Sequence, residues 1–285
     1  MVKIGAHVSS SKSLDLVFDR GREIGADTIQ FFLSSPRSWH WKERSDEEKE
    51  LFIQKRRETG ISPVIAHSSY LFNLASSDPV LRKKSINGVI RELKLCEELK
   101  IDYYVIHAGK SKGLKESEAV KNIIDSVKEI FSKVKLKHTF FLYETLAGQK
   151  GEIGKTTDEL AQLMEPFKKE NTGVCVDTCH IYSAGYKIND EEGFYSYRSE
   201  LSKKIGLENV KVIHCNDSKT PFNSKRDRHE HIGEGSIGYK GFEFFLNDEY
   251  FRRLPFILET PKTADWDIKN MERLRRLIRT APVAQ

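Results

Sequence analysis

Residues 226–238 combine acidic, histidine and glycine residues that could bind a cation. They lie between a predicted strand and a predicted helix, where a core segment would show apolar periodicity instead. Asp227 and His229 are two positions apart, so in an extended loop their side chains point the same way and could hold one metal ion. Such a pair is also common on solvated loops. The metal hypothesis therefore depends on whether other parts of the chain bring similar groups to the same place.

The remainder of the chain alternates short apolar runs with longer helical patterns. The apolar runs predict eight strands that end near His7, Phe32, His67, His107, Glu144, Asp177, His214 and Glu259. Helices are predicted to follow the strands, for example over 46–58, 79–99, 116–133 and 264–279. Eight strand–helix units of about 36 residues fit a (β/α)8 TIM barrel. We expect a single domain over residues 1–285, with 281–285 as a loose tail.

A doubly wound open sheet is the alternative fold for alternating strands and helices. Such sheets commonly bind nucleotides through a glycine-rich turn after a strand. No G-x-G-x-x-G or Walker sequence follows any predicted strand here. The pattern therefore favours the barrel.

Six of the predicted strands end in a residue type that binds metals. These residues are His67, His107, Glu144, Asp177, His214 and Glu259. In a (β/α)8 barrel the carboxyl ends of the strands share one face, so the six could converge on one site. Buried carboxylates and imidazoles are costly unless they are paired or bound to metal. With His180, three residues after Asp177, and the Asp227/His229 pair, nine candidates could hold two or three cations.

Imidazole and carboxylate ligands suit zinc or manganese. The four cysteines show no C-x-x-C spacing, so we expect buried, reduced thiols of an intracellular protein and no structural zinc site. A carboxylate can bridge two cations about 3.5–4 Å apart, an arrangement that suits in-line displacement at a phosphoester.

Composition narrows the class of protein further. The chain has 38% hydrophobic and 31% charged residues, and its formal net charge of +5 gives a mild preference for anionic partners. No apolar run approaches the roughly 20 residues of a membrane span, and the first residues lack a signal-peptide pattern. We therefore expect a cytoplasmic protein with no membrane association.

Six runs around the candidate ligands form a recognisable combination: 5–9 (GAHVS), 143–149 (YETLAGQ), 175–180 (CVDTCH), 214–219 (HCNDSK), 226–235 (RDRHEHIGEG) and 258–261 (LETP). Together they resemble the signatures of the endonuclease IV family, the type 2 apurinic/apyrimidinic endonucleases. The runs extend from residue 5 to residue 261. The resemblance therefore covers almost the whole chain.

The resemblance implies a (β/α)8 barrel with three zinc ions, with Mn²⁺ compatible at one or more of the sites. The implied ligands are His67, His107 and Glu144 for the first ion; Glu144, Asp177, His214 and Glu259 for the second; and His180, Asp227 and His229 for the third. Glu144 and Glu259 are also the implied catalytic residues, because they could steer the proton of the nucleophile.

The implied reaction is hydrolysis of the DNA backbone on the 5′ side of an abasic site, which leaves a 3′-hydroxyl and a 5′-deoxyribose phosphate. Some family members also trim blocked 3′ ends. The implied partner is double-stranded DNA that contains abasic sites, and the implied state is a monomer.

DNA contacts are implied for two loops. Arg37 and Trp39 after the second strand, and Tyr70 and Leu71 after the third, resemble family residues that enter the duplex beside the flipped abasic nucleotide. Trp39 and Leu71 could instead only pack the loops. His7 and His231 are expected to be hydrogen-bond partners of the metal ligands.

Three positions depart from the common family pattern: Ser35 and Thr145 where members often have Asn, and Ala108 where they often have Pro. None removes a candidate ligand. The departures therefore concern the grip on DNA and the hydrogen bonds around the ligands, and leave the metal chemistry unchanged.

Two other functions remain open. A sugar isomerase or epimerase on a related barrel needs only a set such as Glu144, Asp177, His214 and Glu259 around one or two cations. The five additional ligands argue against it. A non-catalytic, metal-stabilised DNA-binding protein would need a dedicated basic groove, and would have no use for nine ligands at an open barrel mouth.

Overall fold

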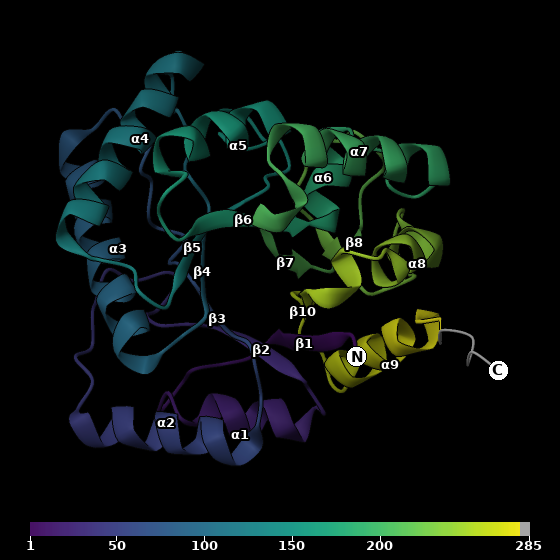
Figure 1. Ribbon diagram of the computed structural model, residues 1–285, viewed down its shortest axis with the longest axis horizontal. Coiled ribbons are helices and arrows are strands. Elements are labelled where there is room, and N and C mark those ends of the chain that lie inside the picture. Colours follow the sequence, from purple (N-terminus) through teal and green to yellow (C-terminus); the bar gives the residue numbers. More distant parts are fainter. Residues whose placement is uncertain (280–285) are drawn as a thin grey trace.

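The chain folds into a closed barrel of parallel strands with helices around it (Figure 1). The computed structural model describes residues 1–279, and the tail predicted over 281–285 lies outside these residues. Within them, eight strands follow one another around the barrel in the order β1-β10-β7-β6-β5-β4-β3-β2. Their bounds are β1 Lys3–His7, β2 Thr28–Phe32, β3 Val64–His67, β4 Tyr103–Ile106, β5 Phe140–Glu144, β6 Thr172–Asp177, β7 Val210–His214 and β10 Pro255–Leu258. The predicted (β/α)8 barrel is confirmed.

The helices form the outer layer. Their bounds are α1 Leu16–Glu23, α2 Asp46–Thr59, α3 Pro79–Leu99, α4 Glu116–Lys133, α5 Thr157–Met164, α6 Thr178–Ala184, α7 Glu191–Lys204, α8 Gly238–Asn247 and α9 Trp266–Leu277. Short 3₁₀ turns are η1 Glu165–Phe167, η2 Leu207–Asn209 and η3 Phe251–Arg253, and a small antiparallel pair is formed by β8 Asp217–Ser218 and β9 His229–Glu230.

Local sequence explains where several helices begin and end. The Ser45 side chain accepts the backbone N–H of Glu48 at the start of α2, and Gly60 ends that helix with a φ of 67°. The predicted helix over 264–279 is shorter, as α9 spans Trp266–Leu277. Ala264 has a φ of 44°, a left-handed conformation that a right-handed helix cannot include.

The interior of the barrel is arranged in layers that position the candidate ligands. One apolar cluster consists of Ile65, Val105, Leu142, Cys175, Val212 and Ile257. Each lies two residues before one of the six strand-end candidates, so the two side chains point to the same face of their strand. The apolar layer therefore fills the barrel beneath the ligand layer, which is left at the carboxyl-terminal mouth.

The cysteines behave as expected, because all four are buried and free. Within residues 1–279, no helix is both long enough and apolar enough to cross a membrane.

Candidate metal centre

Two candidate histidines, from neighbouring strands, lie close to one carboxylate oxygen of Glu144. His67 ends β3, His107 follows β4, and Glu144 ends β5. The Nε2 atoms of His67 and His107 each lie 3.1 Å from Glu144 Oε2. Glu144 and His67 are buried, whereas the side chain of His107 is 28% exposed. This first set can therefore be reached from the barrel mouth on the His107 side.

The other oxygen of Glu144 faces a second set of ligands. Glu144 Oε1 lies 3.0 Å from His214 Nδ1. The same His214 nitrogen is 3.2 Å from Glu259 Oε2 and 3.9 Å from Asp177 Oδ2. One ligand atom from each of these four residues lies within 4.8 Å of the others. Glu144 thus presents one oxygen to each set, the geometry that a bridging carboxylate requires.

A third set involves the loop that was singled out in the sequence. Asp227 Oδ1 lies 3.3 Å from His180 Nε2 and 3.4 Å from His229 Nε2. His180 is in the first turn of α6, and His229 pairs with Ser218 in the β8–β9 ladder. His229 Nε2 is also 3.5 Å from Asp177 Oδ2, so the third set adjoins the second. All nine predicted ligands are brought together.

The hydrogen bonds of the histidines fit metal binding. The Nδ1 atoms of His67, His180 and His229 lie 2.8–3.1 Å from backbone carbonyl oxygens. An N–H at Nδ1 fixes the tautomer and leaves the lone pair of Nε2 free to bind a metal ion. Within the described residues, the Nε2 atoms of His180 and His229 are buried without a hydrogen-bond partner. Since buried polar atoms are rarely left unpaired, a cation is the partner that this donor set suits.

The electrostatics of the metal-free protein point the same way. Burial alone would raise the pKa of the Glu144 carboxyl, but the neighbouring His214 and His107 rings hold it well below its ordinary value. Burial opposes protonation of His180, yet Asp177 and Asp227 raise its pKa well above the ordinary value. Asp177 and Asp227 thus favour the protonated form of His180. Divalent cations would displace this proton and balance the same negative charge.

Comparisons with known proteins identify the family. A model of the family described as xylose isomerase-like TIM barrel matches residues 18–279. "Probable endonuclease 4" of Sulfurihydrogenibium sp. (strain YO3AOP1) is 62% identical over 98% of this chain and 100% of that protein. "Probable endonuclease 4" of Aquifex aeolicus (strain VF5) is 46% identical over 97% and 98% of the two chains. The chain belongs to the endonuclease IV family.

Solved structures agree with this membership. Endonuclease IV from Thermus thermophilus superimposes with a TM-score of 0.85 and 30% identity, covering 96% of this chain and 98% of that one. A D-tagatose 3-epimerase-like protein superimposes with a TM-score of 0.75 at 20% identity, covering 96% of each chain. At that identity the second likeness shows a shared barrel only.

In this endonuclease IV chain, three of the four residues predicted to contact DNA lie beside His107 of the first ligand set. Tyr70 is 56% exposed, and its ring lies 5.5 Å from that of His67 and 5.8 Å from that of His107. Trp39 packs against Phe72 at 5.8 Å between ring centroids. A cavity of about 320 Å³ is lined by Trp39, Tyr70, Leu71 and His107 among others.

Trp39 therefore has a packing role whatever else it does, since Lys84 Nζ also lies 4.4 Å from the centre of its ring. Arg37 is exposed in the same loop, and Leu71 is half-buried. Of the four residues, Arg37 and Tyr70 are thus the exposed ones.

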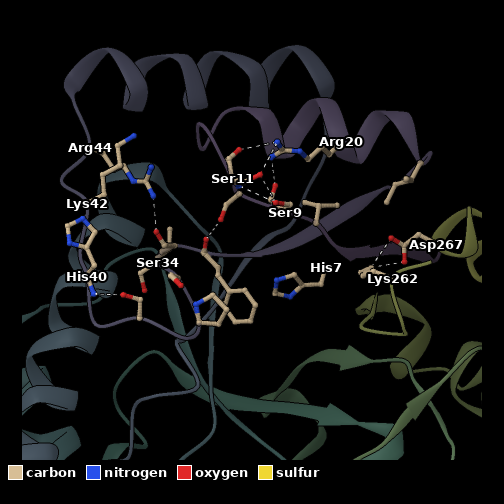
Figure 2. A pocket seen from close by; sticks show the side chains of 18 of the residues that line it. His7, Ser9, Ser11, Arg20, Ser34, His40, Lys42, Arg44, Lys262 and Asp267 are labelled. Atoms are coloured by element: carbon tan, nitrogen blue, oxygen red, sulfur yellow. Dashed lines mark hydrogen bonds and ion pairs between the residues drawn. The ribbon is translucent and has the colours of Figure 1, made fainter. Parts of the chain in front are cut away.

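The ring of His7 lies beside a candidate ligand. Its Nδ1 lies 3.5 Å from Glu259 Oε1. The ring also borders a groove of about 880 Å³ between the loops that follow β1, β2 and β10 (Figure 2). In this groove Arg20 donates to the backbone carbonyls of Ser9 and Ser11 and holds the first loop in place.

His231 is placed differently from the expectation. Its ring stacks on Trp266 at 3.8 Å, and its Nδ1 lies 3.1 Å from Asn270 Nδ2. It hydrogen-bonds to none of the nine candidate ligands, all of which are among the described residues. His231 lies past the end of β9, and the chain turns at Ile232–Gly233, where the backbone N–H of Ile232 donates to the Asn270 side chain of α9.

Sequence reasoning missed the residues that hold the ligands. The Asn216 side chain donates to Asp177 Oδ2 at 2.6 Å and accepts the backbone N–H of Glu259 at 2.7 Å. Asn216 lies in the 214–219 run, and this position could have indicated a role beside the ligands. Gln30, in the middle of β2, contacts His214 and Glu259 and had no such signal.

Two of the departures from the family pattern have visible contacts. Thr145 Oγ1 accepts the backbone N–H of Asp177 at 2.8 Å, and the Thr145 carbonyl is the partner of His180 Nδ1. Ser35 Oγ accepts the backbone N–H of Arg37 at 3.4 Å. Ala108 is buried, and nothing in the structure explains its choice.

Proposed function

We propose that this endonuclease IV-family chain is a DNA-repair endonuclease that hydrolyses the phosphodiester 5′ to an abasic site in double-stranded DNA. The products are a 3′-hydroxyl and a 5′-deoxyribose phosphate, and blocked 3′ ends are further substrates. The convergence of nine imidazole and carboxylate ligands in three adjoining sets carries this proposal. We also propose that the chain acts as a monomer.

The proposed cofactors are three Zn²⁺ ions, with Mn²⁺ able to replace zinc at one or more sites. His67, His107 and Glu144 would hold the first ion; Glu144, Asp177, His214 and Glu259 the second; and His180, Asp227 and His229 the third. When bound, such ions neutralise phosphate charge and make water nucleophilic near neutral pH.

The protein's own residues have three tasks in this reaction. Glu144 and Glu259 present carboxylate oxygens to the inner face of the cluster, where they can orient water and accept its proton. The side chain of Glu259 is 11% exposed, so it reaches the open side of the site. Tyr70 stands at the mouth and can fill the space beside an extruded abasic nucleotide, which has no base to unstack.

A sugar 3-epimerase is the second candidate, because Glu144, Asp177, His214 and Glu259 form one compact set on a barrel of similar shape. Such a reaction leaves five converging ligands without a task. Two of them, His180 and His229, have buried Nε2 atoms that lie near the Asp227 carboxylate but make no hydrogen bond within residues 1–279. The cost of that arrangement favours the endonuclease.

The test uses an end-labelled duplex with one stable abasic-site analogue. We expect a single cut on the 5′ side of the lesion, with a 3′-hydroxyl that a DNA polymerase can extend. Glu259→Gln should abolish cutting, whereas Glu249→Gln, the same change at an exposed residue, should leave it unchanged. An intact duplex combined with turnover of free ketoses would establish the epimerase instead.

A further inference from the structure

Among the four fully or largely buried candidate histidines, His214 differs from the others in the hydrogen bonds that orient its ring. His67, His180 and His229 direct Nδ1 at backbone carbonyls, so their tautomers depend on the main chain. His214 is reversed: its Nδ1 faces Glu144 and Glu259, and its Nε2 lies 2.8 Å from the side-chain oxygen of Gln30. Its orientation therefore depends on a side chain.

Gln30 is placed to hold two ligands of the second set at once. It lies in the middle of β2 and is fully buried, with its side chain directed into the barrel mouth. Its Nε2 lies 2.6 Å from Glu259 Oε1 and 3.1 Å from His7 Nδ1. The Gln30 side chain thus makes its three polar contacts with His7, His214 and Glu259.

The direction of these hydrogen bonds follows from what each group can do. A carboxylate only accepts, so the amide nitrogen of Gln30 must face Glu259. The amide oxygen then faces His214 Nε2, which must carry the proton. A neutral imidazole with its proton on Nε2 has its lone pair on Nδ1. That lone pair points at the second set.

We propose that Gln30 is a positioning residue that fixes His214 in the Nε2–H tautomer and orients Glu259 for the second cation. The inference rests on the proposed metal centre. In it, Gln30 does not bind the cation itself but acts through His214 and Glu259. Partners of this kind orient metal-bound imidazoles, and their removal typically weakens metal binding by about 10–100-fold.

The first experiment measures metal affinity. Gln30→Met keeps the shape of the side chain and removes the amide, and Gln54→Met makes the same change at an exposed position of α2. Metal-free proteins are titrated with Zn²⁺ against a chromophoric chelator. We expect one binding step of Gln30→Met to weaken by about 10–100-fold while the others stay within about twofold. Affinities equal to those of Gln54→Met would overturn the proposal.

The second experiment needs no variant, so it holds even where Gln30→Met fails to fold. Zinc-loaded protein with ¹⁵N-labelled histidine is studied by NMR. We expect His214 to carry a slowly exchanging Nε2–H with zinc on Nδ1, and His67, His180 and His229 to carry Nδ1–H. Zinc bound to Nε2 of His214 would overturn the role of Gln30 and leave the endonuclease proposal standing. Failure of the wild-type protein to bind zinc would overturn both.

Gln30→Glu separates the two tasks of the side chain. A carboxylate there still accepts from His214 Nε2 but no longer donates to Glu259. We expect the His214 Nε2–H signal to persist in Gln30→Glu and to be lost in Gln30→Met, while zinc binding is weakened in both. Loss of the signal from both variants, or from neither, would contradict the assignment.

Discussion

Asp217 holds the loop that carries two of the three ligands of the third set, and replacing it with Asn tests how that set is built. Asp217 is buried at the start of β8. Its Oδ2 accepts the backbone N–H groups of Gly233 at 2.9 Å and Gly235 at 3.1 Å. Its Oδ1 accepts those of Ser218 at 2.8 Å and Ile237 at 2.9 Å. One carboxylate thus ties the 233–237 turn to the strand that pairs with His229.

The magnitude follows from these contacts. Asn has one oxygen, so Asp217→Asn turns an NH₂ group towards at least two backbone donors whichever way the amide is oriented. Each buried donor left without an acceptor costs about 1–3 kcal/mol, so the free energy of unfolding should fall by about 2–6 kcal/mol. Loss of order in the turn should also weaken the third cation site, because Asp227 and His229 lie shortly before the turn in the chain.

Urea unfolding and metal analysis measure the two effects. Glu230→Gln is the matched control: it removes the same charge from the residue opposite Asp217 in the β8–β9 ladder, and should change stability by less than about 1 kcal/mol. We expect Asp217→Asn to bind two cations per chain where the control binds three. Wild-type stability and full metal content in Asp217→Asn would refute this role of the carboxylate.

Three further outcomes are expected. Tyr70→Ala should weaken binding to abasic DNA by about 1–3 kcal/mol at unchanged metal content, whereas the equally exposed Tyr195→Ala should not; unchanged affinity measured by fluorescence anisotropy would exclude a DNA contact. Burial raises the pKa of Glu92 from 4.5 to about 7 despite hydroxyl donors, so the folded state holds a proton that the unfolded chain has released between those pH values. Stability should therefore fall by up to about 3 kcal/mol as pH rises through that range, and Glu92→Gln should remove the fall in urea unfolding at its two ends. Chelation of the bound cations should lower the thermal midpoint, and Zn²⁺ should restore it; at free zinc of about 100 times Kd each site contributes roughly 2.7 kcal/mol, and a midpoint insensitive to chelator would argue against bound metal.

The barrel was predictable because its strands are short apolar runs and its ligands stand at their ends. The spacing of Leu142 and Glu144 illustrates this, since two residues along one strand must share a face and so place the acid one layer above the apolar core. The start of α9 was not predictable in the same way. It depends on the left-handed conformation of Ala264, which no side-chain pattern encodes.

The ligands were easier to find than the residues that hold them. His67 and Glu144 are conspicuous because charged or polar groups are unexpected at the end of an apolar strand. Gln30 sits in an equally apolar strand, but an amide has no single chemical role, and its partners His214 and Glu259 are 184 and 229 residues away. His231 differs from the expectation because the turn after β9 brings its ring against Trp266 and Asn270, a tertiary contact that the sequence pattern does not encode.

The most direct test of the central claim is a titration of metal-free protein with Zn²⁺, in which incision of the abasic duplex is measured at each equivalent. If three sets act together, cutting should remain low at one equivalent and approach its maximum only near three per chain. Full activity at one equivalent, or incision that does not respond to zinc, would contradict the three-cation centre.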